Sequence, residues 1–135
     1  MRKGVIFLVP VPIGNLGDIT LRAIDTLKSV SLIACEDTRK TAFLLKHYEI
    51  PTPKLLSFHK FNERSREELL FAHLEAGEDL VVVSDAGSPA ISDPAQTLVY
   101  EAIKRGIEVQ ALPGATALIP AFSVSGFPST AFQFL

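Results

Sequence analysis

Five short apolar runs constrain the fold of this chain more than any other feature of its sequence. They lie at residues 5–9, 32–35, 55–58, 80–83 and 109–112, the third being the weakest. None of them shows the regular alternation of apolar and polar residues that marks a strand with one solvated face. Unbroken apolar runs of this length are typical of strands buried on both faces, as in parallel sheets.

Helix signals fill the gaps between these runs. We expect helices over residues 21–28, 38–48 and 63–76, a fourth from Asp93-Pro94 to Lys104 or Arg105, and a last one from near Thr116 that keeps Pro120 in its first turn. The expected N-caps are Thr20 for the first helix, Asp37 or Thr38 for the second and Asn62 for the third.

Two further patterns complete the secondary structure. Gly77 and Gly106 each follow a helix and precede a strand, as C′ glycines do. The third helix is expected to turn Leu69, Leu70, Phe71 and Leu74 inward. Strand and helix thus alternate five times, which predicts right-handed crossovers and a five-stranded parallel sheet flanked by helices, an α/β fold.

Composition narrows the function classes. The chain has 135 residues, the size of one domain, and its 13 basic and 15 acidic side chains give a net charge of −2. Bulk positive charge therefore does not hold a nucleic acid here. The single cysteine, Cys35, excludes an internal disulfide, and no apolar run approaches the ~20 residues of a membrane span. We expect a soluble cytoplasmic domain without a membrane partner.

Ligands of open α/β sheets bind beyond the carboxyl ends of the strands. Here those ends are residues 10–18, 36–39, 59–63, 84–93 and 113–116. The first, fourth and fifth of these segments contain no Lys or Arg but include Asp18, Asp85 and Asp93, so a phosphate-rich ligand is disfavoured. The spacing of Gly14 and Gly17 is also not that of a dinucleotide fingerprint. A cationic nucleoside such as S-adenosylmethionine fits better than NAD or ATP, and no metal site is expected.

Structural roles compete with functional ones at several of these positions. Gly14 and Gly17 also suit a simple tight turn, and Asp37 and Asp93 also suit helix caps. Asp85 lies outside an obvious capping register, although its carboxylate also suits a hydrogen bond to the turn at Gly87.

Five motifs in order give the chain a family resemblance. They are PIGNLGDITLR at residues 12–22, EDTR at 36–39, SFH with NE at 57–59 and 62–63, SDAGSPAISDP at 84–94 and PGATA at 113–117. Together they resemble the ribosomal small subunit methyltransferase I family of the tetrapyrrole methylase superfamily. The departures are Val11, where a small or polar residue is more usual, and Ala95, where glycine is usual.

The resemblance implies a class III S-adenosylmethionine-dependent methyltransferase that acts on the ribose 2′-hydroxyl of a cytidine in 16S ribosomal RNA, as a homodimer. The cofactor is expected in a cleft between two α/β domains. Residues 1–131 then form the N-terminal domain, and residues 132–135 begin the linker into a second domain that this chain lacks. By motif match, the implied cofactor-binding residues are Pro12, Gly14, Asp85, Ala86, Gly87, Ile91, Thr116 and Ala117.

A ribose hydroxyl is a poor nucleophile, so a base is expected at the strand ends. The candidate catalytic residues are Glu36, Asp37 and His59, with Asp18 also placed there, while Arg39 is the candidate for an RNA phosphate. Basic side chains also cluster at Lys40 and at Lys60, Arg64 and Arg66, where they equally suit solvated helix faces.

Three other functions stay open. The family-specific motifs at residues 36–39 and 84–94 disfavour the first, a tetrapyrrole methyltransferase of the same superfamily. A magnesium-dependent receiver or phosphohydrolase needs an aspartate at the end of the first strand, where Pro10 stands. A non-catalytic domain that binds a nucleoside or only dimerises is the third.

Overall fold

A five-stranded parallel sheet forms the centre of the molecule in the computed structural model, which describes residues 2–135. Its strands are β1 (Ile6–Leu8), β2 (Leu32–Cys35), β3 (Lys54–Ser57), β4 (Leu80–Val82) and β5 (Val109–Ala111). They stand in the order β3-β2-β4-β1-β5, and every pairing is parallel. The predicted fold class is confirmed, with most strands one or two residues shorter than the apolar runs.

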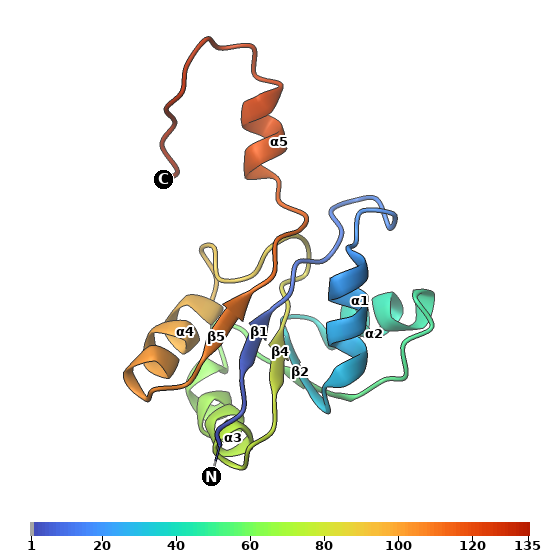
Figure 1. Cartoon of the computed structure of the whole chain (residues 1–135), viewed down its shortest axis with the longest axis vertical. Coiled ribbons are helices and arrows are strands. Elements are labelled where there is room, and N and C mark those ends of the chain that lie inside the picture. The colour runs from blue at the N-terminus through green and yellow to red at the C-terminus, as the bar shows by residue number, and fades with distance from the viewer. Residues whose placement is uncertain (1) are drawn as a thin grey trace.

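Helices cover both faces of the sheet. On one face lie α1 (Leu21–Ser29) and α2 (Thr38–His47), and on the other lie α3 (Glu63–Glu75) and α4 (Ala95–Lys104), as Figure 1 shows. The chain leaves β1 toward β2 and β3, and it leaves β4 in the opposite direction toward β5. Right-handed crossovers in opposite directions require helices on opposite faces. The neighbours β1 and β4 therefore flank the topological switch point, where open α/β sheets bind ligands.

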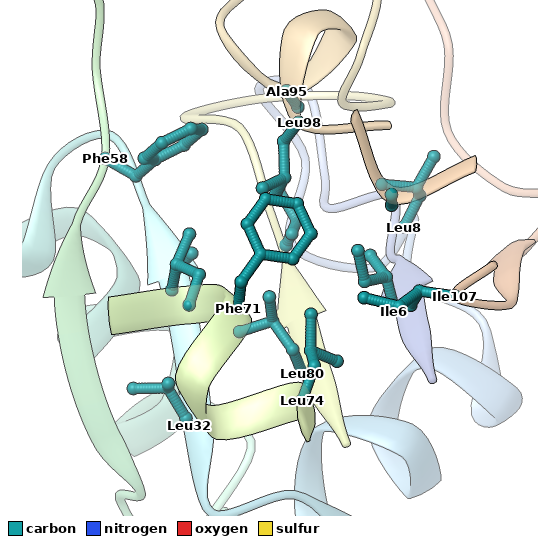
Figure 2. Close-up of a cluster of buried hydrophobic side chains, with 14 residues drawn as sticks. Ile6, Leu8, Leu32, Phe58, Phe71, Leu74, Leu80, Ala95, Leu98 and Ile107 are labelled. Atoms are coloured by element: carbon teal, nitrogen blue, oxygen red, sulfur yellow. The ribbon is translucent and has the colours of Figure 1, made fainter. Parts of the chain in front are cut away.

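Each face of the sheet has its own hydrophobic core. Phe71 of α3 lies in the middle of the first core, beneath the α3–α4 face, and is 1% exposed (Figure 2). Truncating a buried phenylalanine to alanine typically costs about 3–5 kcal/mol. The second core, beneath α1 and α2, contains Ile33, Leu45 and Val81, all fully buried. Alternate residues of one strand, such as Ile33 and Ala34, enter opposite cores, which explains the unbroken apolar runs.

Most predicted helix ends are confirmed. The Thr20 hydroxyl accepts a hydrogen bond from the amide of Ala23 at 2.9 Å, and the Asp37 carboxylate accepts one from the amide of Arg39 at 2.9 Å. Gly77 and Gly106 follow α3 and α4 in the left-handed region, with φ of 89° and 71°. Both glycines therefore end their helices as predicted.

Two sequence predictions about α3 are wrong. Asn62 precedes the helix but does not cap it, because its side chain closes the preceding turn instead, donating to the Ser57 hydroxyl at 3.0 Å and accepting from the His59 amide at 2.8 Å. Leu69 is 53% exposed, whereas Leu70, Phe71 and Leu74 are buried. A stripe through Leu70 and Leu74 is centred away from Leu69, which lies about 100° around the helix from Leu70.

The last helix, α5 (Leu118–Ser123), stands away from the sheet (Figure 1). It starts two residues later than expected and holds Pro120 in its first turn, where a missing amide costs little. None of its residues is buried. The chain then turns back beside α5, and the rings of Phe122 and Phe132 lie 4.9 Å apart. Apolar side chains at Val124, Phe127 and Leu135 are exposed along this segment.

Candidate functional site

The loops after β1 and β4 are joined to each other at the switch point. Val11 and Gly87 exchange two backbone hydrogen bonds of 3.0 and 2.9 Å in an antiparallel bridge. Gly87 has φ of 75°, and a Cβ there would lie 3.1 Å from Cδ1 of Ile13. Glycine thus permits both the backbone conformation and the close approach of the two loops.

One pocket of about 550 Å³ opens beside this bridge, within the size range of small-molecule sites. The loops after β4 and β5 supply most of its lining, and Ile13, Leu118 of α5 and Phe134 complete it. All the lining side chains among residues 2–135 are uncharged, and we call it the uncharged pocket. The predicted cofactor residues that line it are Ala86, Gly87, Ile91, Thr116 and Ala117.

A second pocket of about 680 Å³ lies against the loops after β1, β2 and β4 and the first turns of α2. We call it the charged pocket, because Asp37, Arg39, Lys40 and Asp85 line it together with apolar residues that include Phe43. The remaining predicted cofactor residues, Pro12, Gly14 and Asp85, lie here rather than in the uncharged pocket. The sequence predicted a single cofactor site, and the structure divides its residues between these two pockets. Thr116 and Ala117 also line a third pocket of about 800 Å³, where the candidate residue Asp18 lies.

The two pockets share a wall. In the loop after β1, Pro12 lines the charged pocket and Ile13 lines the uncharged one. In the loop after β4, Asp85 lines the charged pocket, while Ala86 and Gly87 line the uncharged one. The bridged loops thus form a ridge with a polar and an apolar side.

Asp85 ties the ridge to the loop after β2. Its carboxylate accepts a hydrogen bond from the amide of Asp37 at 3.1 Å and lies 3.5 Å from Nζ of Lys40. The turn at Gly87 is held by another residue, because the Ser84 hydroxyl donates to the carbonyls of Ala86 and Gly87 at 2.9 and 3.2 Å. Asp85 therefore sets how the charged pocket is assembled.

Asp37 is held as an anion. The amide and guanidinium of Arg39 donate to its carboxylate and lower its pKa below the ordinary value. A carboxylate with a lowered pKa is a weaker base. This environment suits a helix cap and an electrostatic partner better than a proton acceptor.

Glu36 has the opposite environment. Burial raises the pKa of its carboxyl above the ordinary value, and the negative charges of Asp85 and Asp93 raise it further, while Lys40 and His59 act the other way. Its carboxylate has no hydrogen bond or ion pair among residues 2–135. A half-buried carboxylate with a raised pKa and free lone pairs is suited to accepting a proton.

His59 lies at the carboxyl end of β3, beside β2, but lines neither pocket. Its ring nitrogens lie 3.2 Å from the amide of Phe61 and 3.3 Å from Nδ2 of Asn62. Nδ1 accepts from the Phe61 amide, whereas the neighbour of Nε2 is an amide nitrogen that already donates to Ser57. The ring is thus held in its own turn, outside both pockets.

Asp93 shapes the far side of the uncharged pocket. Its carboxylate accepts hydrogen bonds of 2.9 Å from the amides of Ala90 and Ala95. The loop between them holds Ala90 and Ser92 at φ of 67° and 58°, a strained conformation for residues with a Cβ. Between them Ile91, 54% exposed, lines the uncharged pocket. The predicted capping role of Asp93 is thus joined by a second, loop-holding role.

Sequence reasoning missed Ile13 and Phe43 as pocket residues. The signal for Phe43 was present, because it follows Arg39 by four residues on α2 and therefore shares a helix face with it. Ile13 had no such signal, since its place depends on the bridge to Gly87. No group of His, Cys, Asp and Glu residues suited to a metal ion occurs within residues 2–135. In the same part of the chain, no helix is long and apolar enough to cross a membrane.

Comparison with known proteins gives one family. The family of tetrapyrrole (corrin/porphyrin) methylases matches residues 5–134. The ribosomal RNA small subunit methyltransferase I of Mycoplasmopsis pulmonis is 51% identical over 130 residues, which are 96% of this chain and 58% of that protein. The protein of the same name from Synechocystis is 51% identical over 97% of this chain and 47% of its own length. The chain therefore spans about half the length of the curated relatives it matches.

Solved structures agree on the fold. A uroporphyrin III C-methyltransferase of Thermus thermophilus superposes with a TM-score of 0.68 at 21% identity, over 88% of this chain and 52% of that one. A cobalamin synthesis related protein of Corynebacterium diphtheriae superposes with a TM-score of 0.57 at 19% identity, over 93% of this chain and 58% of that one. Each match again covers roughly half of the other chain.

Proposed function

The chain belongs to the tetrapyrrole (corrin/porphyrin) methylase family, and from that premise we propose that it is the cofactor-binding half of a ribosomal RNA methyltransferase. The proposed methyl donor is S-adenosylmethionine, and the proposed acceptor is the ribose 2′-hydroxyl of a cytidine in 16S ribosomal RNA of the small subunit. The observation that carries the acceptor is the identity of about 50% with proteins named for small-subunit ribosomal RNA methylation.

The uncharged pocket fits the proposed cofactor. Its size suits a nucleoside with an amino-acid tail, and Ile13, Ile91 and Leu118 offer apolar sides to an adenine ring. The backbone amide of Ala86 and the hydroxyl of Thr116 are available beside them, whereas the backbone groups of Gly87 are engaged by Val11 and Ser84. A pocket lined by uncharged groups also places no cation beside a sulfonium. We assign the cofactor to these residues and the acceptor to the charged pocket.

The donor supplies an electrophilic methyl group on a sulfonium centre. The chain's own contribution is positional, because in-line displacement depends on how the two reactants are held. The two pockets lie against the same ridge, so donor and acceptor are held next to each other, and Asp85 fixes the loop after β2 against that ridge. Among Glu36, Asp37 and His59, Glu36 has the environment that favours accepting the proton of the ribose hydroxyl, whereas Asp37 and His59 are engaged within their own turns. Glu36 precedes Asp37 in the loop after β2 but does not itself line the charged pocket.

We further propose the domain division expected from the sequence, with residues 1–131 as the N-terminal domain and 132–135 leading onward. The exposed apolar side chains of α5 and the following segment support a partner surface there, for a second domain or for the second subunit of a homodimer. An enzyme acting on ribosomal RNA is expected in the cytoplasm.

Calorimetry tests the cofactor first. The 135-residue chain is titrated with S-adenosylmethionine, S-adenosylhomocysteine, NAD and ATP under one buffer condition. We expect the first two to bind more tightly, and weakly in absolute terms because further contacts are expected from a second domain. Equal or tighter binding of NAD or ATP contradicts the assignment.

Methyl transfer tests the acceptor. The chain, extended by the second half of the Mycoplasmopsis pulmonis relative, is incubated with tritiated S-adenosylmethionine and either 16S ribosomal RNA or uroporphyrinogen III. We expect label in the RNA, at a position whose phosphodiester then resists alkaline hydrolysis. A cooperative melting transition shows that the extended protein is folded. Label in the tetrapyrrole alone, from a folded protein, refutes the RNA acceptor.

A further inference from the structure

An aromatic ring and two cations lie together at the mouth of the charged pocket. Phe43 is 62% exposed, and among the exposed phenylalanines it is the one that lines the charged pocket. It lies on α2 one turn beyond Arg39 and Lys40, and all three side chains line the same pocket. An exposed aromatic face beside basic side chains is the combination with which proteins bind single-stranded nucleic acids.

The two cations are available to a ligand. The Arg39 side chain is 91% exposed, and its Nε lies 3.4 Å from the Asp37 carboxylate. Lys40 is 62% exposed and lies 3.5 Å from Asp85. Exposed ion pairs of this length contribute little to stability, so exchanging them for contacts with a phosphate costs little.

Exposure also separates the two signs of charge in this pocket. The Asp37 and Asp85 side chains are 29% and 32% exposed, about half the value of Lys40 and a third of that of Arg39. The carboxylates are thus recessed and the cations stand outward. A ligand with its phosphate at the rim and its apolar part against Phe43 matches this distribution.

We propose that the charged pocket binds one nucleotide of a single-stranded RNA, with its base stacked on Phe43 and its phosphate beside Arg39 and Lys40. The RNA class rests on the proposed function, whereas the pocket and its contacts rest on the structure. A paired base has both faces covered by its neighbours, so only an unpaired or splayed-out base can stack on this ring. Phe43 thereby selects an accessible nucleotide, and the cations hold its backbone.

The test measures RNA affinity by fluorescence anisotropy with the 135-residue chain at fixed, low salt. The probes are a labelled eight-nucleotide single-stranded RNA of mixed sequence and an oligomer of the same length without bases. Phe43→Leu is expected to weaken binding of the RNA about tenfold while leaving the abasic oligomer unchanged, because the leucine removes the ring but keeps an apolar side chain. Phe43→Trp keeps an aromatic face and is expected to retain the affinity.

Arg39→Ala tests the phosphate contact. It is expected to weaken the binding of both probes. The slope of the logarithm of the binding constant against the logarithm of salt concentration should fall in magnitude by about 0.7, the value for one phosphate of a single strand. Lys46→Ala removes a cation from the opposite end of the same helix and is expected to change neither. Tyr100→Leu removes an exposed ring with a lysine 5.4 Å from its centroid on α4, and serves as the matched aromatic control.

Three results would overturn the proposal. Phe43→Leu leaves RNA affinity within twofold of wild type, or it weakens the abasic oligomer equally, or it weakens S-adenosylmethionine instead of RNA in calorimetry. The last result gives the pocket to the cofactor. Failure of the proposed function gives a different result. If the wild-type chain binds no S-adenosylmethionine and Phe43→Leu still weakens RNA binding, the cofactor assignment is wrong and the proposed RNA contact at the charged pocket stands. Thermal melts of every variant show that the fold is retained.

Discussion

Gly87→Ala is the substitution that most directly probes the ridge between the pockets. At φ of 75°, an alanine costs roughly 1–2 kcal/mol relative to glycine because its Cβ crowds the backbone. The new Cβ would also lie 3.1 Å from Cδ1 of Ile13, the far end of a flexible side chain. Moving that side chain off its rotamer adds about 0.5–1.5 kcal/mol. We therefore expect a total loss of about 1.5–3.5 kcal/mol in the free energy of unfolding.

Gly106→Ala is the matched control. Gly106 has φ of 71°, but a Cβ there would meet nothing within 4 Å. It should cost only the backbone strain, roughly 1–2 kcal/mol. Urea unfolding of both variants measures the difference, and in thermal melts each kcal/mol corresponds to about 4 °C for a domain of this size. Adding Ile13→Ala to Gly87→Ala removes the side chain that the new Cβ would crowd. Relative to Ile13→Ala alone, the double variant should therefore lose no more unfolding free energy than Gly106→Ala loses relative to wild type.

Cofactor affinity provides the second measurement. Displacement of Ile13 and loss of one backbone contact near Gly87 should weaken S-adenosylmethionine binding about threefold to tenfold, whereas Gly106→Ala should leave it unchanged. Equal destabilisation by the two alanines, with no coupling to Ile13, would refute the steric argument. Unchanged affinity in a destabilised Gly87→Ala variant would refute the placement of the cofactor.

Glu36→Gln should alter how stability depends on pH. The folded-state pKa of Glu36 is raised, so stability falls as pH rises from the ordinary glutamate pKa through that raised value. The variant should be more stable than wild type at neutral pH, and the difference should vanish below about pH 4. Urea unfolding at pH 7 and below pH 4 measures the two differences, and equal values would contradict a raised pKa of Glu36. Asp85→Asn keeps an acceptor for the Asp37 amide but loses the Lys40 ion pair, so it should cost less than about 1 kcal/mol in unfolding free energy. Because Asp85 lines the charged pocket, the variant should keep its affinity for S-adenosylmethionine in calorimetry, and a clear loss of that affinity would contradict the assignment of the cofactor to the uncharged pocket.

Local signals in the sequence determined the elements of this fold. Continuous apolar runs identified the strands because alternate residues of each strand enter two separate cores, as Ile33 and Ala34 do. Thr20 and Asp37 were readable as caps because a side-chain oxygen bonds an amide two or three residues away. Asn62 was misread because its side-chain oxygen, which a cap would need, accepts instead from the amide of His59, three residues upstream.

Only the tertiary structure decided the strand order and therefore the site. Nothing periodic in the sequence states that β4 stands between β2 and β1, since packing between distant segments fixes that order. The order brings Val11 against Gly87, and the bridge between them turns Pro12 toward one pocket and Ile13 toward the other. The same order sets Asp85 beside Asp37, 48 residues apart in the chain. The sequence thus supplied the residues of the candidate site, and long-range pairing of the loops divided them into an uncharged and a charged pocket.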